Sequence, residues 1–384
     1  MYNILTLNKI ASCGTDLLPD SSYAVNDSVS NPDAVVVRSA SMHEMELGDN
    51  LLAIARAGAG VNNIPIDKCS EKGIAVFNTP GANANAVKEL VIAGLLLASR
   101  KIVPSTEWIK SLKGKGDEVG KLVEKGKSQF VGPEIAGKTL GIIGLGAIGA
   151  LVANAAVALG MEVYGVDPFL SDAAKSMLSP DVHIVTSNDE IYKISDYISI
   201  HVPSTPETKG MINANTIAKM KNGVRIVNFA RADLVDSKAI LDALSSVKMA
   251  AYVTDFATDD LLCVDNVIAI PHLGASTPES EDNCAMMACT EVKNYLETGE
   301  ILNSVNLPNV SLAKTGDALV TVISKEADNL ANKLRAAAGV SVLGCASGAK
   351  KGMAYTILDV KGDANSAKAK LEAVDGVIRV RVIK

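Results

Sequence analysis

The feature that most limits the fold of this chain is the sequence KTLGIIGLGAIG at residues 138–149. A short apolar run at residues 140–143 predicts a buried strand, and the Ala-rich residues 150–159 predict a helix directly after it. The turn between them holds three glycines in a GxGxxG pattern: Gly144, Gly146 and Gly149. A strand, a glycine-rich turn and a helix in this order open a parallel sheet, so the segment predicts an α/β fold.

The three glycines and a later acid also predict a ligand. Gly144 permits the tight turn, Gly146 lets the backbone approach a pyrophosphate, and Gly149 lets the helix pack closely on the sheet. A second predicted strand, residues 161–167, ends in Asp167, 18 residues after Gly149. That offset is close to the value of about 20 expected for the acid that binds the ribose hydroxyls. Because this carboxylate would repel a 2′-phosphate, the predicted cofactor is NAD rather than NADP.

Composition narrows the class of protein. At 384 residues the chain is long enough for two or three domains, and 48% hydrophobic residues allow each domain a core. The net charge of −6 comes without a basic stripe, which disfavours nucleic acid as a partner. The longest apolar run, residues 90–98, is too short to cross a membrane, and no signal segment is visible, so we expect a soluble, cytoplasmic protein. None of the six cysteines forms a CxxC pair, and we expect no metal site.

Predicted strands and helices alternate along most of the chain, which indicates doubly wound parallel sheets of the Rossmann or flavodoxin-like kind. We expect a substrate-binding domain at residues 1–100, completed by about residues 278–303, and a NAD-binding domain at residues 101–277. A Lys- and Gly-rich stretch, residues 113–127, is predicted to be a solvated crossover or linker. The predicted strands are short and apolar: residues 3–7, 34–38, 52–57, 74–77, 161–167, 183–185, 197–202, 224–228, 250–255 and 267–270.

The last part of the chain, residues 310–384, follows a simpler pattern. Its predicted order is strand, helix, strand, strand, helix, strand, which is the ferredoxin-like arrangement. The predicted elements are residues 318–324, 327–337, 341–346, 354–360, 365–373 and 377–382. We expect this third domain to resemble ACT-type ligand-sensing domains.

Candidate catalytic residues follow predicted strands, where open α/β sheets bind ligands. Arg231, Asp255 and His272 each stand at or just after the end of a separate predicted strand. His201 is a second histidine at a strand end. A lone histidine is more often structural than catalytic, so the pattern by itself leaves both interpretations open.

Several motifs together resemble the D-isomer-specific 2-hydroxyacid dehydrogenases. Besides the glycine fingerprint, these are RAGAGVNN at residues 56–63, NTPGANANAVKE at 78–89, VNFAR at 227–231 and PHLGAST at 271–277. The last motif and the C-terminal domain resemble the branch of the family that acts on 3-phosphoglycerate. The resemblance implies NAD-dependent oxidation of 3-phospho-D-glycerate to 3-phosphooxypyruvate, the first step of the phosphorylated route to serine. It also implies a homodimer or homotetramer with the active site in a cleft between two domains.

The resemblance assigns catalytic roles to three residues. His272 is the acid/base that takes the hydroxyl proton, and Arg231 anchors the substrate carboxylate. The family has a glutamate beside this histidine, and Asp260 stands at that position with a side chain one methylene shorter. We hypothesise that Asp260 pairs with His272, with Asp259 as the alternative partner.

The resemblance also implies binding residues. Those expected to line the cofactor site are Thr79, Gly144, Gly146, Ala147, Ile148, Gly149, Asp167, Val202, Phe229, Ala230, Asp255, Gly274 and Ala275. Those expected to bind the substrate are Arg38, Ser39, Gly58, Gly60 and Asn83. Arg38 and Ser39 are assigned to the phosphate, although a surface arginine at a strand end is an equally ordinary feature.

Two departures from the family keep alternatives open. Ala232 stands where the family has glycine, which raises the question of whether that turn needs a positive φ. The turn at residues 324–329, SKEADN, lacks the Pro-Gly of serine-sensing ACT domains, so we expect weak or absent inhibition by serine. The alternatives are a dehydrogenase for glyoxylate, hydroxypyruvate or another unphosphorylated acid, an NAD-sensing scaffold protein, and a catalytically lapsed enzyme.

Overall fold

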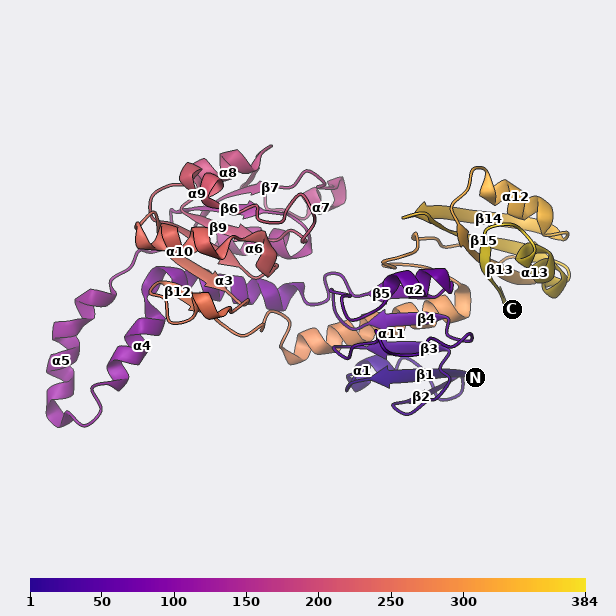
Figure 1. Ribbon diagram of the computed structural model, residues 1–384, viewed down its shortest axis with the longest axis horizontal. Coiled ribbons are helices and arrows are strands. Elements are labelled where there is room, and N and C mark those ends of the chain that lie inside the picture. Colours follow the sequence, from indigo (N-terminus) through magenta and orange to yellow (C-terminus); the bar gives the residue numbers. More distant parts are fainter. The chain divides into compact units, whose positions relative to one another are not determined.

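The computed structural model describes residues 1–384, apart from the side chain of Ala173. The chain forms two compact units (Figure 1). Unit 1 comprises Met1–Asn83 and Pro278–Lys384, and unit 2 comprises Ala84–Thr277. Each unit has its own sheets and cores, and each is described by itself.

Unit 1 opens with a parallel sheet of five strands in the order β2-β1-β3-β4-β5. The strands are β1 (Tyr2–Leu7), β2 (Tyr23–Asn26), β3 (Ala34–Val37), β4 (Ala53–Arg56) and β5 (Ala75–Asn78). This is the flavodoxin-like order, which confirms the fold class predicted for this part of the chain. Strand β2 goes unpredicted because its four residues, YAVN, are too few to show a pattern.

Three helices accompany this sheet: α1 (Ser12–Thr15), α2 (Ile66–Glu71) and α11 (Pro278–Thr298). Helix α11 packs on β3, β4 and β5 and brings the C-terminal part of the chain back to the N-terminal sheet (Figure 1). Its buried residues recur three and four positions apart, so they form one face that contacts the sheet. They include Cys284, Ala288, Val292, Tyr295 and Leu296.

The C-terminal part of unit 1 is an antiparallel sheet in the order β14-β15-β13-β16, with two helices. Its elements are β13 (Ala318–Lys325), α12 (Leu330–Ala337), β14 (Ser341–Lys350), β15 (Met353–Lys361), α13 (Ala364–Glu372) and β16 (Val377–Ile383). The order of elements is the predicted ferredoxin-like βαββαβ. Helix α12 begins three residues later than predicted, after Asn329, whose φ of 55° lies in the left-handed region.

The ferredoxin-like sheet shares a core with the end of α11. Tyr355 donates a hydrogen bond to the carbonyl of Gly299 at 2.6 Å. The guanidinium of Arg381 lies 4.5 Å from the ring centroid of Tyr295 and donates to the carbonyl of Leu296 at 3.1 Å. These groups lie within one hydrophobic cluster together with residues of the N-terminal sheet, so the C-terminal part is built into unit 1.

Unit 2 is built on a parallel sheet of seven strands in the order β12-β11-β10-β9-β6-β7-β8. The strands are β6 (Thr139–Ile143), β7 (Glu162–Val166), β8 (Val182–Ile184), β9 (Tyr197–Ile200), β10 (Val224–Asn228), β11 (Met249–Thr254) and β12 (Val267–Ala269). Counted from β6, this is the Rossmann order with one extra strand, as predicted. Two hydrophobic clusters, one against each face, cover the sheet.

The helices of unit 2 are α3 (Ala84–Arg100), α4 (Ile102–Lys110), α5 (Val119–Gly126), α6 (Ala147–Ala158), α7 (Asp172–Ser176), α8 (Asn188–Ile194), α9 (Ala214–Lys219) and α10 (Ser237–Ser245). Short 3-10 turns are η1 (Gly116–Glu118), η2 (Lys127–Phe130), η3 (Ala232–Leu234) and η4 (Asp259–Leu261). Helix α3 packs on α6, β10 and β11. Unit 2 therefore begins at Ala84, whereas the sequence had placed the boundary at residue 100.

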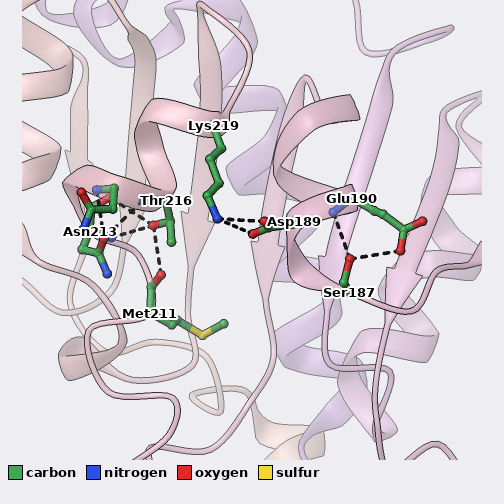
Figure 2. A network of polar contacts seen from close by, with 8 residues as sticks. Ser187, Asp189, Glu190, Met211, Asn213, Thr216 and Lys219 are labelled. Carbon is green, nitrogen blue, oxygen red and sulfur yellow. Dashed lines mark hydrogen bonds and ion pairs between the residues drawn. The ribbon is translucent and has the colours of Figure 1, made fainter.

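Side chains cap the helices that cover one face of this sheet (Figure 2). The side chain of Asn213 accepts a hydrogen bond from the backbone N–H of Thr216, and Thr216 Oγ1 accepts one from the backbone N–H of Asn213. These two bonds make a capping box at α9. Ser187 caps α8 through the N–H of Glu190. Lys219 then joins the two helices by contacting both oxygens of Asp189 at 2.8 Å.

The stretch predicted to be a linker is helical. Residues 101–131, which we call the arm, form α4, η1, α5 and η2 and extend away from the sheet of unit 2 (Figure 1). Trp108 on α4 packs against Phe130 of η2, with the rings tilted by 49° and their centroids 5.3 Å apart, so the contact joins the two ends of the arm. The charged residues of 113–127 are exposed, as the prediction of a solvated segment expected, but the helices were not predicted because their few apolar residues pack into no core.

No helix in the described part of the chain is both long and apolar enough to cross a membrane. The six cysteines are free thiols: Cys69, Cys284 and Cys289 are buried, Cys13 and Cys345 are partly exposed, and Cys263 is exposed.

Candidate active site

The glycine fingerprint lies between β6 and α6, and each glycine meets a different steric demand. Gly144 has a φ of 95°, and a Cβ there would lie 2.5 Å from the carbonyl oxygen of His201. A Cβ on Gly149 would lie 1.9 Å from the carbonyl oxygen of Gly144. A Cβ on Gly146 would meet no heavy atom within 4 Å. Gly144 and Gly149 are therefore required by the protein's own packing, whereas the open space over Gly146 suits a ligand.

The N-terminus of α6 is also left open. Asn213 and Asp236 cap α9 and α10 with their side chains, but the N-cap of α6 is Gly146, which has none. The first N–H groups of a helix have no partner within the helix, so here they can bind an anion. Ala147 and Ile148 stand in this first turn.

Asp167 follows β7 and lies beside the fingerprint. Its Oδ2 accepts the N–H of Leu145, and its Oδ1 accepts the N–H of Phe169, both at 2.9 Å. These bonds hold the carboxylate in one orientation next to the glycine turn. Each oxygen still has a lone pair free for a hydroxyl donor.

Three predicted site residues follow strands in the other half of the same sheet, at the same carboxyl edge as the glycine turn. Arg231, Asp255 and His272 follow β10, β11 and β12, which are neighbours in the sheet. The charges of His272 and Arg231 act on the Asp255 carboxyl, so the three side chains form one electrostatic group. The cofactor candidates Phe229, Ala230, Gly274 and Ala275 lie in the same loops, and Val202 follows β9.

Asp255 is the buried member of this group. Its side chain is 3% exposed, and neither carboxylate oxygen has a hydrogen-bond partner among the described residues. Burial raises the pKa of the Asp255 carboxyl above its ordinary value, and the charges of His272 and Arg231 oppose that rise. The backbone N–H groups of Asp255 and Gly274 also lower the pKa of this carboxyl, but neither forms a well-aligned hydrogen bond with it. The buried acid can therefore accept a donor from a ligand, because an unpaired polar group in the interior costs free energy.

The two strand-end histidines differ in environment. His272 is exposed, and its ring packs edge-on against Phe256 with centroids 5.1 Å apart. His201 has its Nε2 within 2.8 Å of Ser199 Oγ, and burial lowers the pKa of His201 to about 4. His201 is therefore neutral near pH 7 and engaged with the protein, so His272 is the better candidate for proton transfer.

Asp260 lies in η4 and has another partner. Its Oδ1 accepts a hydrogen bond from Thr258 Oγ1, and no ion pair joins it to His272 within the described part of the chain. Asp259, the alternative partner, is exposed in the same 3-10 turn. The carboxyl group whose charge interacts with His272 here is that of Asp255.

Asn228, which holds the loop that carries Arg231, was not among the predicted site residues. Asn228 is fully buried, its Nδ2 donates to the carbonyl of Arg231 at 2.9 Å, and its Oδ1 accepts the N–H of Ala230 at 3.1 Å. Its position as the last residue of a buried strand was the available signal. Ala232 begins η3 without a positive φ, so this turn has no need of glycine.

Unit 1 carries the residues expected to bind substrate. Strands β1 and β3 lie side by side at the point where the strand order reverses, which is where open α/β sheets bind ligands. Asn8 follows β1, and its Oδ1 accepts the N–H groups of Ser39 and Ala40 at 2.9 and 2.7 Å. Arg38 forms an ion pair with Glu281 at 2.5 Å. Sequence reasoning found neither Asn8 nor Glu281, because both act through the tertiary fold.

The remaining candidates of unit 1 lie in the loops after β4 and β5. Gly58 has a φ of 152°, a conformation that favours glycine, and its carbonyl accepts the N–H of Thr79 at 3.2 Å. Thr79 is fully buried, and its hydroxyl has no partner among the described residues. Gly60 and Asn83 are partly exposed in the same two loops.

Comparison with known proteins decides the family. Residues 92–274 match the model of the D-isomer specific 2-hydroxyacid dehydrogenase NAD-binding domain. A hydroxypyruvate reductase from Thermotoga maritima is 42% identical over 261 residues, which are 65% of this chain and 80% of that protein. The chain belongs to the D-isomer-specific 2-hydroxyacid dehydrogenase family.

Other members of this 2-hydroxyacid dehydrogenase family extend the comparison. A D-3-phosphoglycerate dehydrogenase from Methanocaldococcus jannaschii is 37% identical over 300 residues, covering 76% of this chain and 55% of that protein. The chain spans about half the length of the curated phosphoglycerate dehydrogenases it matches. The crystal structure of NAD+-bound 3-phosphoglycerate dehydrogenase from Entamoeba histolytica has a TM-score of 0.63 and 27% identity, covering 79% of this chain and 98% of that one.

Within the described residues, no group of three or more His, Cys, Asp or Glu side chains could hold a metal ion. The polar groups of unit 2 instead suit an organic ligand. The open space over Gly146 suits a phosphate, and the oriented carboxylate of Asp167 suits hydroxyl groups. The carboxyl of Asp255 can accept a hydrogen bond from a donor of the ligand.

Proposed function

We propose that this dehydrogenase is NAD-dependent and oxidises 3-phospho-D-glycerate to 3-phosphooxypyruvate, in the cytoplasm, as the first step of phosphorylated serine synthesis. The observation that carries the proposal is the convergence of Arg231, Asp255 and His272 after three neighbouring strands. An anchoring cation and an imidazole base are what the oxidation of a hydroxy acid requires. The phosphoglycerate dehydrogenases among the relatives support the choice of substrate.

The residues of unit 2 fit NAD. The space over Gly146 and the uncapped start of α6 suit the pyrophosphate, and Asp167 suits the ribose hydroxyls. The carboxylate of Asp255 would accept the N–H groups of the nicotinamide carboxamide and so gain the partners it lacks. When bound there, NAD would supply the hydride acceptor that the oxidation of a hydroxyl group needs. We infer that unit 2 is the NAD-binding domain and that the parallel sheet of unit 1 belongs to the substrate-binding domain.

The side chains of this protein supply the rest of the chemistry. His272 takes the proton of the substrate hydroxyl as the hydride leaves, because it is exposed and has no competing hydrogen bond within the described residues. Arg231 binds the substrate carboxylate through two parallel N–H donors, and Asn228 fixes the loop that presents it. Unit 1 contributes substrate-binding candidates of its own: the charge of Arg38 suits the phosphate, and polar groups are offered by Ser39, Gly58, Gly60 and Asn83.

The test is a comparison of three substrates in the reducing direction. The purified protein is mixed with NADH and equal concentrations of 3-phosphooxypyruvate, hydroxypyruvate or glyoxylate, and NADH absorbance is followed. We expect a kcat/KM for the phosphorylated acid at least about tenfold above that for the other two, because charged hydrogen bonds to the phosphate contribute about 1.5–3 kcal/mol each. Comparable rates for all three acids would contradict the assignment of the substrate. Binding of NADH without turnover of any acid would favour the scaffold alternative.

A dehydrogenase for unphosphorylated acids is a second candidate. It is favoured by the ion pair between Arg38 and Glu281, because a carboxylate on Arg38 competes with a substrate phosphate. The hydroxypyruvate reductase among the relatives points the same way. The variants Glu281→Gln and Arg38→Gln separate the two candidates. If phosphoglycerate is the substrate, Glu281→Gln lowers the KM for the phosphorylated acid, Arg38→Gln raises it, and neither change alters the KM for hydroxypyruvate.

We further infer that the protein is a homo-oligomer, at least a dimer assembled through unit 2. The arm supports this, since it presents apolar side chains to solvent: Ile102 (43% exposed), Val103 (41%), Ile109 (46%) and Val131 (72%). A second copy with the same apolar residues would bury them. Sedimentation equilibrium should give a dimer or tetramer mass, and Ile109→Glu should lower it. A monomer mass for the unaltered protein would contradict the inference.

A further inference from the structure

A cavity outside the site described above lies in unit 1, along α11. Its volume is about 470 Å³, which is in the range of pockets for small organic ligands. The wall is formed by α11 and by the segments at residues 81–82 and 300–303. None of the residues assigned above to cofactor, substrate or proton transfer lines it.

Glu291 lines this cavity as a buried acid in which one of the two carboxyl oxygens has a hydrogen-bond partner. It is 6% exposed, and its Oε1 accepts a hydrogen bond from Asn303 Nδ2 at 2.8 Å. Its Oε2 is buried without a partner among the described residues. Burial raises the pKa of Glu291 to about 8, and the bond from Asn303 opposes that rise. A buried carboxyl group next to a cavity, with one oxygen unused, is a natural partner for a donor that enters the cavity.

The rest of the wall defines the chemistry of that donor. A second acid, Glu300, lines the cavity and accepts a hydrogen bond from Asn294 at 3.3 Å, and no Lys, Arg or His is part of the wall. The apolar part of the wall comes from Met286, Met287 and Leu302. Methionine side chains are flexible and adapt to aliphatic groups. Two acids, flexible apolar side chains and no base match a small aliphatic chain that ends in an ammonium group.

We propose that this cavity is a binding site for small aliphatic amines, with Glu291 as the counter-ion of the ammonium group. Binding converts a protonated glutamic acid and an ammonium ion into an ion pair and releases one proton to the solvent. The proposal does not depend on the substrate of the dehydrogenase, because no residue of the proposed active site takes part.

Isothermal titration of the full-length protein with n-butylamine at pH 7 tests the proposal. Butan-1-ol and butanoate serve as the neutral and anionic probes of similar length. We expect saturable binding of butylamine, at least about tenfold weaker binding of butan-1-ol, and none of butanoate. Titrations in two buffers of different ionisation enthalpy should report release of a proton. Absence of saturable butylamine binding, or equal binding of the alcohol, would overturn the proposal.

Variants locate the site. Glu291→Gln keeps the shape and the acceptor for Asn303 but removes the charge, so it should weaken butylamine binding about tenfold or more and abolish proton release. Glu297→Gln, at an exposed position of the same helix, removes a charge outside the cavity and should leave binding unchanged. Leu302→Trp narrows the cavity from its exposed rim and should also weaken binding, which gives an independent result if Glu291→Gln fails to fold. Unchanged binding in the folded Glu291 and Leu302 variants would refute the proposal.

Discussion

At the scale of single residues, each unit contains candidate ligand-binding groups whose own hydrogen bonds are incomplete. Asp255 and Thr79 are buried with unused polar atoms, and Gly146 has open space above it. Other groups near them are satisfied by the protein itself: Asn228 bonds two backbone groups, and a Cβ on Gly149 would collide with the carbonyl of Gly144. Buried polar groups are normally paired, so the unpaired ones indicate where ligand atoms belong.

The fingerprint glycines allow a matched test. Gly146→Ala meets no atom, and a φ of −66° accepts alanine, so this variant should unfold at nearly the same temperature as the wild type and bind NADH at least about tenfold more weakly. Gly149→Ala collides with backbone and should lose about 1–3 kcal/mol of stability. Thermal unfolding and NADH fluorescence titration measure both effects. Equal NADH affinity in Gly146→Ala would argue against a pyrophosphate at this turn.

The buried Glu291 predicts a dependence of stability on pH. Its pKa is about 8 in the folded protein and 4.5 as the ordinary value, so the folded state holds its proton more tightly than the unfolded state. The resulting stability is complete below about pH 4.5 and is lost as the pH rises through 8, at up to about 1.4 kcal/mol per pH unit. Denaturant unfolding from pH 5 to 9 measures the fall in the free energy of unfolding with pH, and this fall should be smaller in Glu291→Gln than in the wild type. The same slope in both proteins would assign it to other groups.

Asp260 gives a third test at this scale. If its carboxylate turns to His272 in the loaded enzyme, Asp260→Asn should lower kcat and move the acid limb of the pH–rate profile to lower pH, because a positive imidazolium loses its counter-charge. The profile of kcat/KM for the wild type and the variant measures this. An unchanged acid limb would leave Asp255 as the only acid that influences His272.

At the scale of elements, local caps fix the helices that cover the sheet of unit 2. The capping box of α9 and the ion pair from Lys219 to Asp189 hold α8 and α9 together on one face (Figure 2). Helix α6 lacks such a cap, because its N-cap residue is Gly146. Its first backbone N–H groups can therefore bind a ligand, whereas those of α8 and α9 are bound by side chains.

The cap of α9 can be tested by a single change. Asn213→Ala removes the acceptor for two backbone N–H groups and should cost about 0.5–2 kcal/mol of stability. Asn215→Ala, two residues later in the same first turn and without a cap bond from its side chain, is the control and should change stability by less than about 0.5 kcal/mol. Urea unfolding measures both. A similar loss in the two variants would mean that the side chain of Asn213 adds little.

At the scale of the whole molecule, the C-terminal sheet of unit 1 is joined to the N-terminal sheet through α11. Arg381 and Tyr355 contact the end of that helix, and its start carries Glu281, the partner of Arg38. We propose that the ferredoxin-like part is an ACT-like domain that assists assembly rather than sensing serine. The loop from β13 to α12 ends in Asn329 with a left-handed φ and lacks the Pro-Gly of serine-sensing domains.

This assignment predicts how the enzyme responds to serine. Millimolar serine should change the initial rate of NADH oxidation by less than about twofold, because a twofold change corresponds to only about 0.4 kcal/mol of coupling. The assay uses the full chain with its preferred substrate, and glycine serves as the control amino acid. A marked, saturable fall in rate with serine alone would show that the domain senses serine despite the altered loop.

The sequence by itself determined where most strands and helices form and in which order the candidate site residues follow along the chain. The spacing of Gly144, Gly146 and Gly149 and the apolar runs before and after them are local signals, and they predicted the strand, turn and helix found there. The same holds for the βαββαβ order of the tail. Local signals work here because each depends on neighbouring residues and on the period of a helix or strand.

Only the tertiary structure decided which side chains interact. It paired Arg38 with Glu281, set Asn228 under the loop of Arg231, and brought the charge of Asp255 to His272. It also made residues 101–131 a helical arm and buried Glu291 beside a cavity. These contacts join residues distant in sequence or depend on burial, and both are properties of packing that no local pattern of residues encodes.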